Sequence, residues 1–193
     1  MRLPHRSFRS AALAALVLAL VAACGEPLGL PRANFANRVD TLALYALSGT
    51  PVTVPSGLRL QDSRAVRTDQ TPVFDFAFDI DTAGRALLLP TGALQLGRLS
   101  GGQISSLPFD SIRIAPDRNY QLDSAIVVDS GTVAILHSRP TDCGFGLVVP
   151  LYAKVRVLAI DTTSGPNGRR IDFEILSNAN CGYRGLELGL PTR

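Results

Sequence analysis

The sequence lacks tryptophan and contains a single lysine, Lys154, and two histidines, of which His137 alone lies beyond the first 24 residues. Zinc sites of cysteine and histidine need several such ligands, so the composition disfavours them. The sequence contains no glycine-rich phosphate loop followed by lysine, and no serine in a Gly-x-Ser-x-Gly frame. Long stretches in which apolar residues recur at helical spacing are also scarce. Nothing in the sequence therefore amounts to a recognisable active site, and we expect no enzyme activity and no cofactor.

The N-terminus has the parts of an export signal in their usual order. Three arginines precede an uncharged apolar run, 11–23, which ends in Val-Ala-Ala-Cys at Cys24. The run is shorter than the ~20 apolar residues that a membrane-spanning helix needs. A basic start followed by a short apolar stretch and small residues is typical of a secretory signal peptide.

The ending at Cys24 resembles the lipobox of bacterial lipoproteins, whose cysteine receives a diacylglyceryl group before a dedicated signal peptidase cuts ahead of it. The resemblance covers residues 1–24 and implies that 1–23 are removed and that Cys24 anchors the chain in a lipid bilayer. Residues 25 and 26 are Gly and Glu, and the aspartate that retains many lipoproteins in the inner membrane is absent, so the outer membrane is favoured. The alternatives are an ordinary secretory peptide with an accidental cysteine, or a short membrane anchor.

Removal of residues 1–23 would also change the charge of the chain. The whole sequence has 19 Lys and Arg against 16 Asp and Glu, and the removed segment holds three of the arginines and no acid. Basic and acidic residues are then equal in number, and no net positive field remains to attract nucleic acid. We therefore expect no nucleic-acid partner.

The remaining chain is long enough for one domain with a real core. Residues 24–38 comprise the lipidated cysteine and a segment with two prolines and two glycines, which predicts a flexible tether. We place a single β domain at 39–193.

Alternation and turn residues predict that this domain is all-β. Val73–Asp81 alternates between four apolar side chains on one face, namely Phe74, Phe76, Phe78 and Ile80, and mostly acidic ones on the other. Gly84 then turns the chain into a second strand at 85–89. The same reasoning predicts three further hairpins and two further strands; the hairpins join 93–99 to a strand near 103, 121–129 to 132–138, and 153–161 to 170–177, and the strands are 39–48 and 111–115. About nine or ten such strands favour an antiparallel β-sandwich or barrel.

In the last of these hairpins, charges of opposite sign occupy facing strands. Lys154 and Arg156 share one face of their strand, and Asp172 and Glu174 share one face of the partner strand. We expect these side chains to pair and to help fix the register.

The two cysteines that remain after Cys24, Cys143 and Cys181, form an even pair in similar frames, each followed by glycine. Export to an oxidising compartment makes a disulfide their natural use. Two unrelated buried thiols are the alternative. A cysteine-based metal site is disfavoured because one histidine alone is available to join them.

Three carboxylates and His137 are the remaining candidates for chemistry. Asp75, Asp79 and Asp81 alternate along one strand, and oxygens grouped in this way are a weak candidate for Ca²⁺. The plainer interpretation is a solvated strand face ending in a hairpin turn. His137 lies close in sequence to Asp142, but a lone histidine at a strand end is more often structural, so we assign no catalytic residue.

Two functional hypotheses follow. The first is a non-enzymatic envelope lipoprotein that binds a protein partner or has a structural role, with a binding surface in the loops around Cys143 and Cys181. The second is an envelope lipoprotein that binds a ligand, polysaccharide or Ca²⁺, or that hydrolyses polysaccharide. It requires exposed tyrosines or converging carboxylates near Asp75–Asp81.

Overall fold

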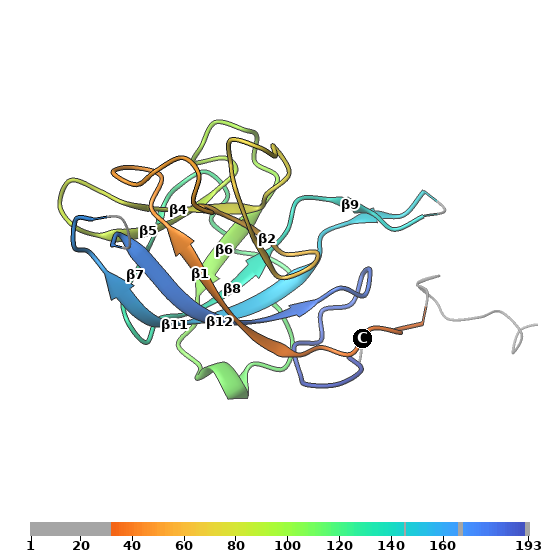
Figure 1. Ribbon diagram of the computed structural model, residues 1–193. Coiled ribbons are helices and arrows are strands. Elements are labelled where there is room, and N and C mark those ends of the chain that lie inside the picture. The colour runs from red at the N-terminus through yellow and green to blue at the C-terminus, as the bar shows by residue number, and fades with distance from the viewer. Residues whose placement is uncertain (1–31, 145, 166–167, 192–193) are drawn as a thin grey trace, which may run out of the picture. The chain divides into compact units, whose positions relative to one another are not determined.

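The computed structural model describes residues 32–144, 146–165 and 168–191 (Figure 1). These residues form twelve β-strands in three antiparallel sheets, together with one 3₁₀ turn, η1 (Phe109–Ser111). The predicted all-β, antiparallel sandwich architecture is confirmed. The strands are β1 (Val39–Tyr45), β2 (Gly57–Arg59), β3 (Arg64–Val66), β4 (Phe76–Ile80), β5 (Ala86–Pro90), β6 (Gly101–Ile104), β7 (Ile126–Val128), β8 (Val133–His137), β9 (Thr141–Asp142), β10 (Val148–Val149), β11 (Tyr152–Asp161) and β12 (Arg170–Asn178).

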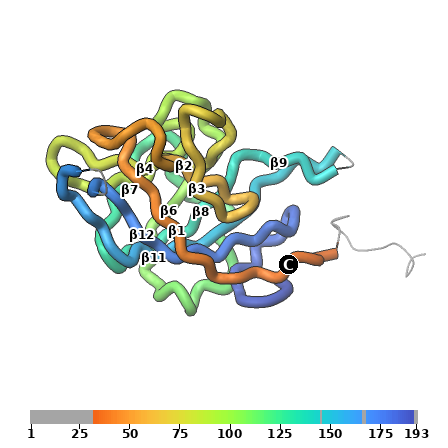
Figure 2. The backbone as a smooth tube through the Cα atoms, viewed as in Figure 1, coloured from red at the N-terminus to blue at the C-terminus, as the bar shows by residue number. Residues whose placement is uncertain are grey.

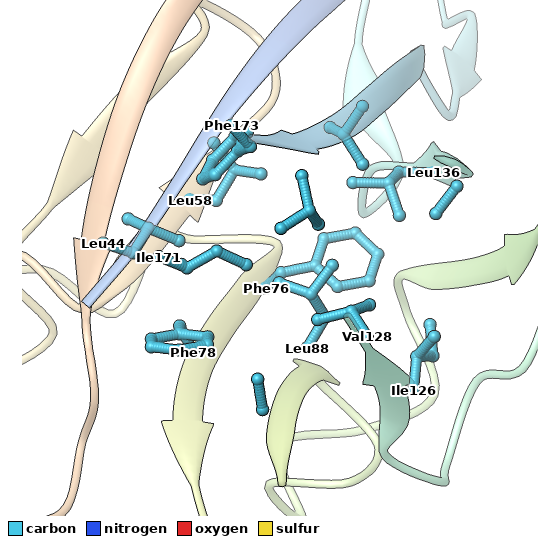
Figure 3. Packing of buried hydrophobic residues seen from close by; sticks show 14 of the residues in the cluster. Leu44, Leu58, Phe76, Phe78, Leu88, Ile126, Val128, Leu136, Ile171 and Phe173 are labelled. Atoms are coloured by element: carbon cyan, nitrogen blue, oxygen red, sulfur yellow. The ribbon is translucent and has the colours of Figure 1, made fainter. Parts of the chain in front are cut away.

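Two five-stranded sheets enclose the main core. The first has the order β1-β12-β11-β8-β6 and the second the order β3-β2-β4-β5-β7. Apolar side chains from both sheets meet between them, as Figure 3 shows; the labelled residues are Leu44, Leu58, Phe76, Phe78, Leu88, Ile126, Val128, Leu136, Ile171 and Phe173. The third sheet is the small β9–β10 hairpin, which projects from the sandwich in Figure 1.

Two predicted hairpins, β4–β5 and β11–β12, are confirmed. In the first, Phe78 faces Leu88 across the pair. Phe74 does not join the core face of β4, however, and packs instead in a separate small cluster with Val66 and Ala77. Strand β4 is therefore buried on both faces, which a simple alternation of apolar and polar residues does not reveal.

The charge pairing predicted across β11 and β12 is confirmed in one place. Arg156 faces Glu174, and the Nε and Oε1 atoms of the pair are 2.6 Å apart. Lys154 faces Leu176 instead of an acid. The register shifts after Val157, and Asp172 forms its ion pair with Arg170 on its own strand.

The hairpin predicted between 121–129 and 132–138 is wrong. β7 pairs with β5 in one sheet, whereas β8 pairs with β11 and β6 in the other. The Ser130-Gly131 turn therefore crosses between sheets, and the N–H of Gly131 bonds the carbonyl of Val157 at 2.9 Å. β7 and β8 each supply core residues from opposite sides of the sandwich, so their apolar patterns do not indicate whether they are neighbours.

Two other predicted strands are absent from the described chain. Residues 93–99 form successive tight turns, in which Ala93, Leu94 and Gln95 each donate to a carbonyl three residues earlier. Residues 111–115 lie in and after η1, with an isolated bridge between Ile114 and Gly185 in place of a strand. In the described residues, no helix has the length and apolar character needed to cross a membrane.

Candidate functional site

The predicted disulfide between Cys143 and Cys181 is present, with the two Cα atoms 6.0 Å apart. Cys143 lies in the β9–β10 hairpin, and Cys181 lies in the turn that follows β12. The bond therefore fastens the projecting hairpin to the C-terminal segment of the chain.

A network of asparagines surrounds the cysteine of that turn. Asn178 Oδ1 accepts from both the backbone N–H and the Nδ2 of Asn180, each at 2.9 Å. Asn180 Oδ1 in turn accepts the backbone N–H groups of Asn34 and Phe35, at 2.8 and 3.0 Å. Asn178 and Asn180 are both almost fully buried, so these bonds are shielded from water and hold the first described residues in one place.

A second set of bonds fastens the same segment three residues later. Asn37 and Gly189 exchange backbone hydrogen bonds of 2.7 and 3.1 Å. The buried Asn37 side chain donates to the carbonyls of Gly185 and Glu187. We call residues 33–39 together with 178–191 the anchor end. Figure 2 shows these N- and C-terminal segments side by side.

The packed chain thus begins earlier than the sequence indicated. Ala33–Arg193 forms one compact unit, and the N–H of Ala33 donates to the hydroxyl of Tyr183 at 3.1 Å. Residues 33–38, assigned above to the tether, are therefore part of the folded domain. Alternation cannot reveal this, because asparagine side chains and not apolar contacts hold the segment.

The structure separates the three candidate carboxylates. Asp75 precedes β4 and is 3% exposed, and its carboxylate accepts the N–H groups of Leu60 and Arg139 at 2.7 and 2.9 Å. It does not share a solvated face with Asp79 and Asp81. Asp81 accepts the N–H of Arg85, which lowers the pKa of its carboxyl.

Within the described chain, no group of three or more His, Cys, Asp or Glu is placed to hold a metal ion. Asp75, Asp79 and Asp81, the weak candidates for a Ca²⁺ site, therefore form no ligand cluster in the described residues.

Asp79 and Asp81 instead line an open cavity of about 680 Å³ at the opposite end of β1 from the anchor end. Asp79 accepts the N–H and the hydroxyl of Ser48, both at 2.9 Å. Arg169 donates to the carbonyls of Ser48 and Ile80, both at 2.6 Å, and so ties three loops together. Glycine at position 49 leaves room for the Arg169 side chain, because a Cβ there would lie 2.9 Å from Arg169 Nε. Sequence patterns do not reveal this role of Arg169.

His137 lies on the outer side of β8 among tyrosines. Its ring centroid is 4.6 Å from that of Tyr120 and 6.5 Å from that of Tyr152. Nδ1 is 2.9 Å from the carbonyl of Ser138, which can accept but not donate, so the proton of the neutral ring sits on Nδ1. Burial lowers the pKa of His137. The ring is thus held neutral against these groups, and the contacts of His137 are with Ser138 and the two tyrosines and not with Asp142.

Lys154, which the alternation predicts to pair with an acid of the facing strand, is instead buried. It is 3% exposed, and its Nζ donates to the carbonyls of Phe109 and Ile112 at 2.8 and 2.9 Å. The same Nζ lies 4.6 Å from the centroid of the Phe109 ring. Burial lowers the pKa of Lys154. An adjoining cavity of about 330 Å³ is lined by mixed side chains, among them Val39, Arg113 and Leu188.

Comparisons with protein-family models, with curated proteins and with solved structures found no match to this chain.

Proposed function

We propose that this chain is a lipoprotein of the bacterial cell envelope, anchored through Cys24 and favouring the outer membrane, whose β-sandwich is a non-enzymatic interaction or structural module. The observation that carries the proposal is the Val-Ala-Ala-Cys ending of the apolar run at Cys24, nine peptide links before the packed domain begins at Ala33. Such spacing suits a domain displayed close to a membrane.

Acyl chains on one cysteine are sufficient for this attachment. Each buried methylene contributes ~0.8 kcal/mol, so two chains hold a protein far more firmly than one. The described domain then needs no membrane-crossing element of its own. Cleavage before Cys24 would leave its amine and its lipidated thiol as the new N-terminus.

Support for an interaction role comes from how the reactive side chains are used. Asp75, Asp79 and Asp81 each accept hydrogen bonds from backbone N–H groups of the domain. His137 and Lys154 donate to backbone carbonyls. The β9–β10 hairpin, by contrast, projects from the sandwich (Figure 1). Its Val148 side chain is exposed. A hairpin held by a disulfide is a rigid element on which surface complementarity can be built. We propose the loops around Cys143 and Cys181 as the partner-binding surface.

Site-specific photo-crosslinking in living cells tests this proposal. A crosslinking amino acid replaces Val148 in the hairpin or Val52 in the loop after β1; both positions are well exposed, at 58% and 66%. We expect a protein adduct from position 148, none from position 52, and loss of the adduct in Cys24→Ala. An equal adduct pattern at both positions, or no adduct at 148, would overturn the binding surface. Retention of Cys24→Ala in the membrane fraction would overturn the anchor.

A second candidate function is the binding of an envelope polysaccharide at the cavity around Arg169. The observation that favours it is the lining of that cavity by three hydroxyl side chains, two carboxylates and an arginine, which are the groups that bind sugar hydroxyls; these are Ser48, Thr82, Ser164, Asp79, Asp81 and Arg169. Titration calorimetry with envelope oligosaccharides tests it. Binding that Thr82→Trp abolishes by filling the cavity would favour this function, and absence of binding would remove it.

A further inference from the structure

Four large apolar side chains are exposed around one backbone bridge at the anchor end. The bridge joins Asn37 to Gly189, and each of the four lies within two residues of one of these positions. Leu188 is 70% exposed and Leu190 is 61% exposed. The four residues, which we call the anchor-end patch, are Phe35, Val39, Leu188 and Leu190.

The patch is held on a fixed backbone. Asn180 bonds both the N–H and the carbonyl of Phe35, at 3.0 and 2.8 Å. Asn37 bonds Gly189 in both directions, which fixes the residues on either side of it. The backbone that carries these apolar side chains is therefore fixed by hydrogen bonds within the anchor end.

The position of the patch indicates what covers it. Nine peptide links join Cys24 to Ala33, and nine residues span at most about 30 Å when fully extended. Ala33 is bonded to Tyr183 within the anchor end. Because the lipid is attached at the other end of this short segment, the anchor end is the part of the domain that must stay near the bilayer.

We infer that the anchor-end patch rests on the bilayer that carries the lipid anchor and inserts Phe35, Leu188 and Leu190 into its headgroup region. This inference rests on the proposed lipidation of Cys24. Apolar side chains on a protein surface bind the interface by burying their area at the headgroup and acyl boundary. Contact at this end points β1 away from the membrane, so the cavity around Arg169 faces outward.

The absence of tryptophan allows a direct test. Single variants Leu188→Trp and Phe35→Trp place one indole in the patch, and Val52→Trp places one beyond the far end of β1 at a similar exposure of 66%. Each mature lipoprotein is purified from membranes and reconstituted into phosphatidylethanolamine and phosphatidylglycerol vesicles, with or without brominated phosphatidylcholine. Flotation of the vesicles first measures whether the protein is attached, and tryptophan quenching then measures its depth.

We expect all three variants to float with the vesicles and the indoles at 188 and 35 to be quenched about twofold or more, because an inserted apolar surface reaches ~5–10 Å into the boundary. The indole at 52 should keep its fluorescence. Flotation with equal, weak quenching at all three positions would overturn the inference and leave the lipid anchor standing, and the patch would then fit a protein partner. Failure to float would overturn the anchor and the inference together.

Discussion

The carboxylate of Asp75 accepts a 2.9 Å hydrogen bond from the backbone N–H of Arg139, 64 residues later in the chain. Its other oxygen accepts the N–H of Leu60 at 2.7 Å. Leu60 follows β2 and Arg139 follows β8, so one buried carboxylate joins strands of both large sheets. The Arg139 guanidinium, with Nε 3.4 Å from the carboxylate, supplies the compensating charge.

Removing this carboxylate should cost more than the loss of an ordinary acid. Asp75→Ala leaves the buried N–H of Leu60 and the partly buried N–H of Arg139 without their acceptor, and an unsatisfied buried donor costs about 1–3 kcal/mol. We expect the urea midpoint to fall markedly. Asp69→Ala is the control, because it removes a solvent-exposed pair with Arg67. Equal midpoints for the two variants would contradict the role assigned to Asp75.

Local patterns were sufficient to predict β4–β5, β11–β12 and the disulfide. In each hairpin the two strands are close in sequence, and both bury apolar side chains on the same core face, which gives each strand its alternation of apolar and polar residues. They were not sufficient for β7 and β8, because a strand buried on one face has the same alternation of apolar and polar residues whichever sheet it joins. Sheet membership depends on long-range packing, which one sequence does not display.

The side chains that organise the ends of the domain were harder to predict for a different reason. Lys154, Arg169 and Asn180 all bond backbone groups from distant segments. Any residue supplies a backbone carbonyl or N–H, so these contacts leave no pattern of paired residue types. Arg156 and Glu174 were predictable because both partners are side chains on adjacent strands.

The disulfide should contribute substantially to stability. It closes a loop with a sequence separation of 38 residues, and constraint of the unfolded chain over such a loop contributes about 4 kcal/mol. Replacing both Cys143 and Cys181 by serine should therefore lower the free energy of unfolding by about that amount. Denaturation of the wild type with reductant provides the comparison. This would be contradicted if reductant left the denaturation midpoint of the wild type unchanged and that midpoint equalled the midpoint of the double variant.

Lys154 should stabilise η1 through its two carbonyl bonds. Lys154→Met keeps the apolar stem but removes the Lys154 donor from the buried carbonyls of Phe109 and Ile112. The Phe109 carbonyl keeps the N–H of Ile112 as a donor, whereas the Ile112 carbonyl loses its donor, and a buried unsatisfied group costs about 1–3 kcal/mol. Arg113→Met is the control, since Arg113 is exposed and lines the same cavity. Urea unfolding of both variants measures the difference. A Lys154→Met midpoint no lower than that of the control would show that the bonds contribute nothing.

His137 should make stability fall in mildly acidic solution. Burial lowers its pKa in the folded chain below the ordinary value of 6.5, to which it returns on unfolding. Between the two pKa values the unfolded chain binds more protons, so stability is lost as pH falls below about 6.5. Asp81 titrates at lower pH, because the N–H of Arg85 lowers its pKa as well.

The measurement is the free energy of unfolding at about pH 7.5 and about pH 5.5, a range that brackets the unfolded histidine. His137→Gln should lose less stability over this interval than the wild type. The opposite order, or a folded-state His137 titration above 6.5 by NMR, would contradict the burial of a neutral ring.

The mass of the N-terminal peptide of the protein extracted from membranes tests lipid attachment at Cys24. We predict a peptide that begins at Cys24, lacks residues 1–23 and carries a diacylglyceryl group on the sulfur, with further mass where the amine is acylated. A peptide that begins at any other residue, or one that contains Cys24 without lipid, would contradict the proposed lipid anchor.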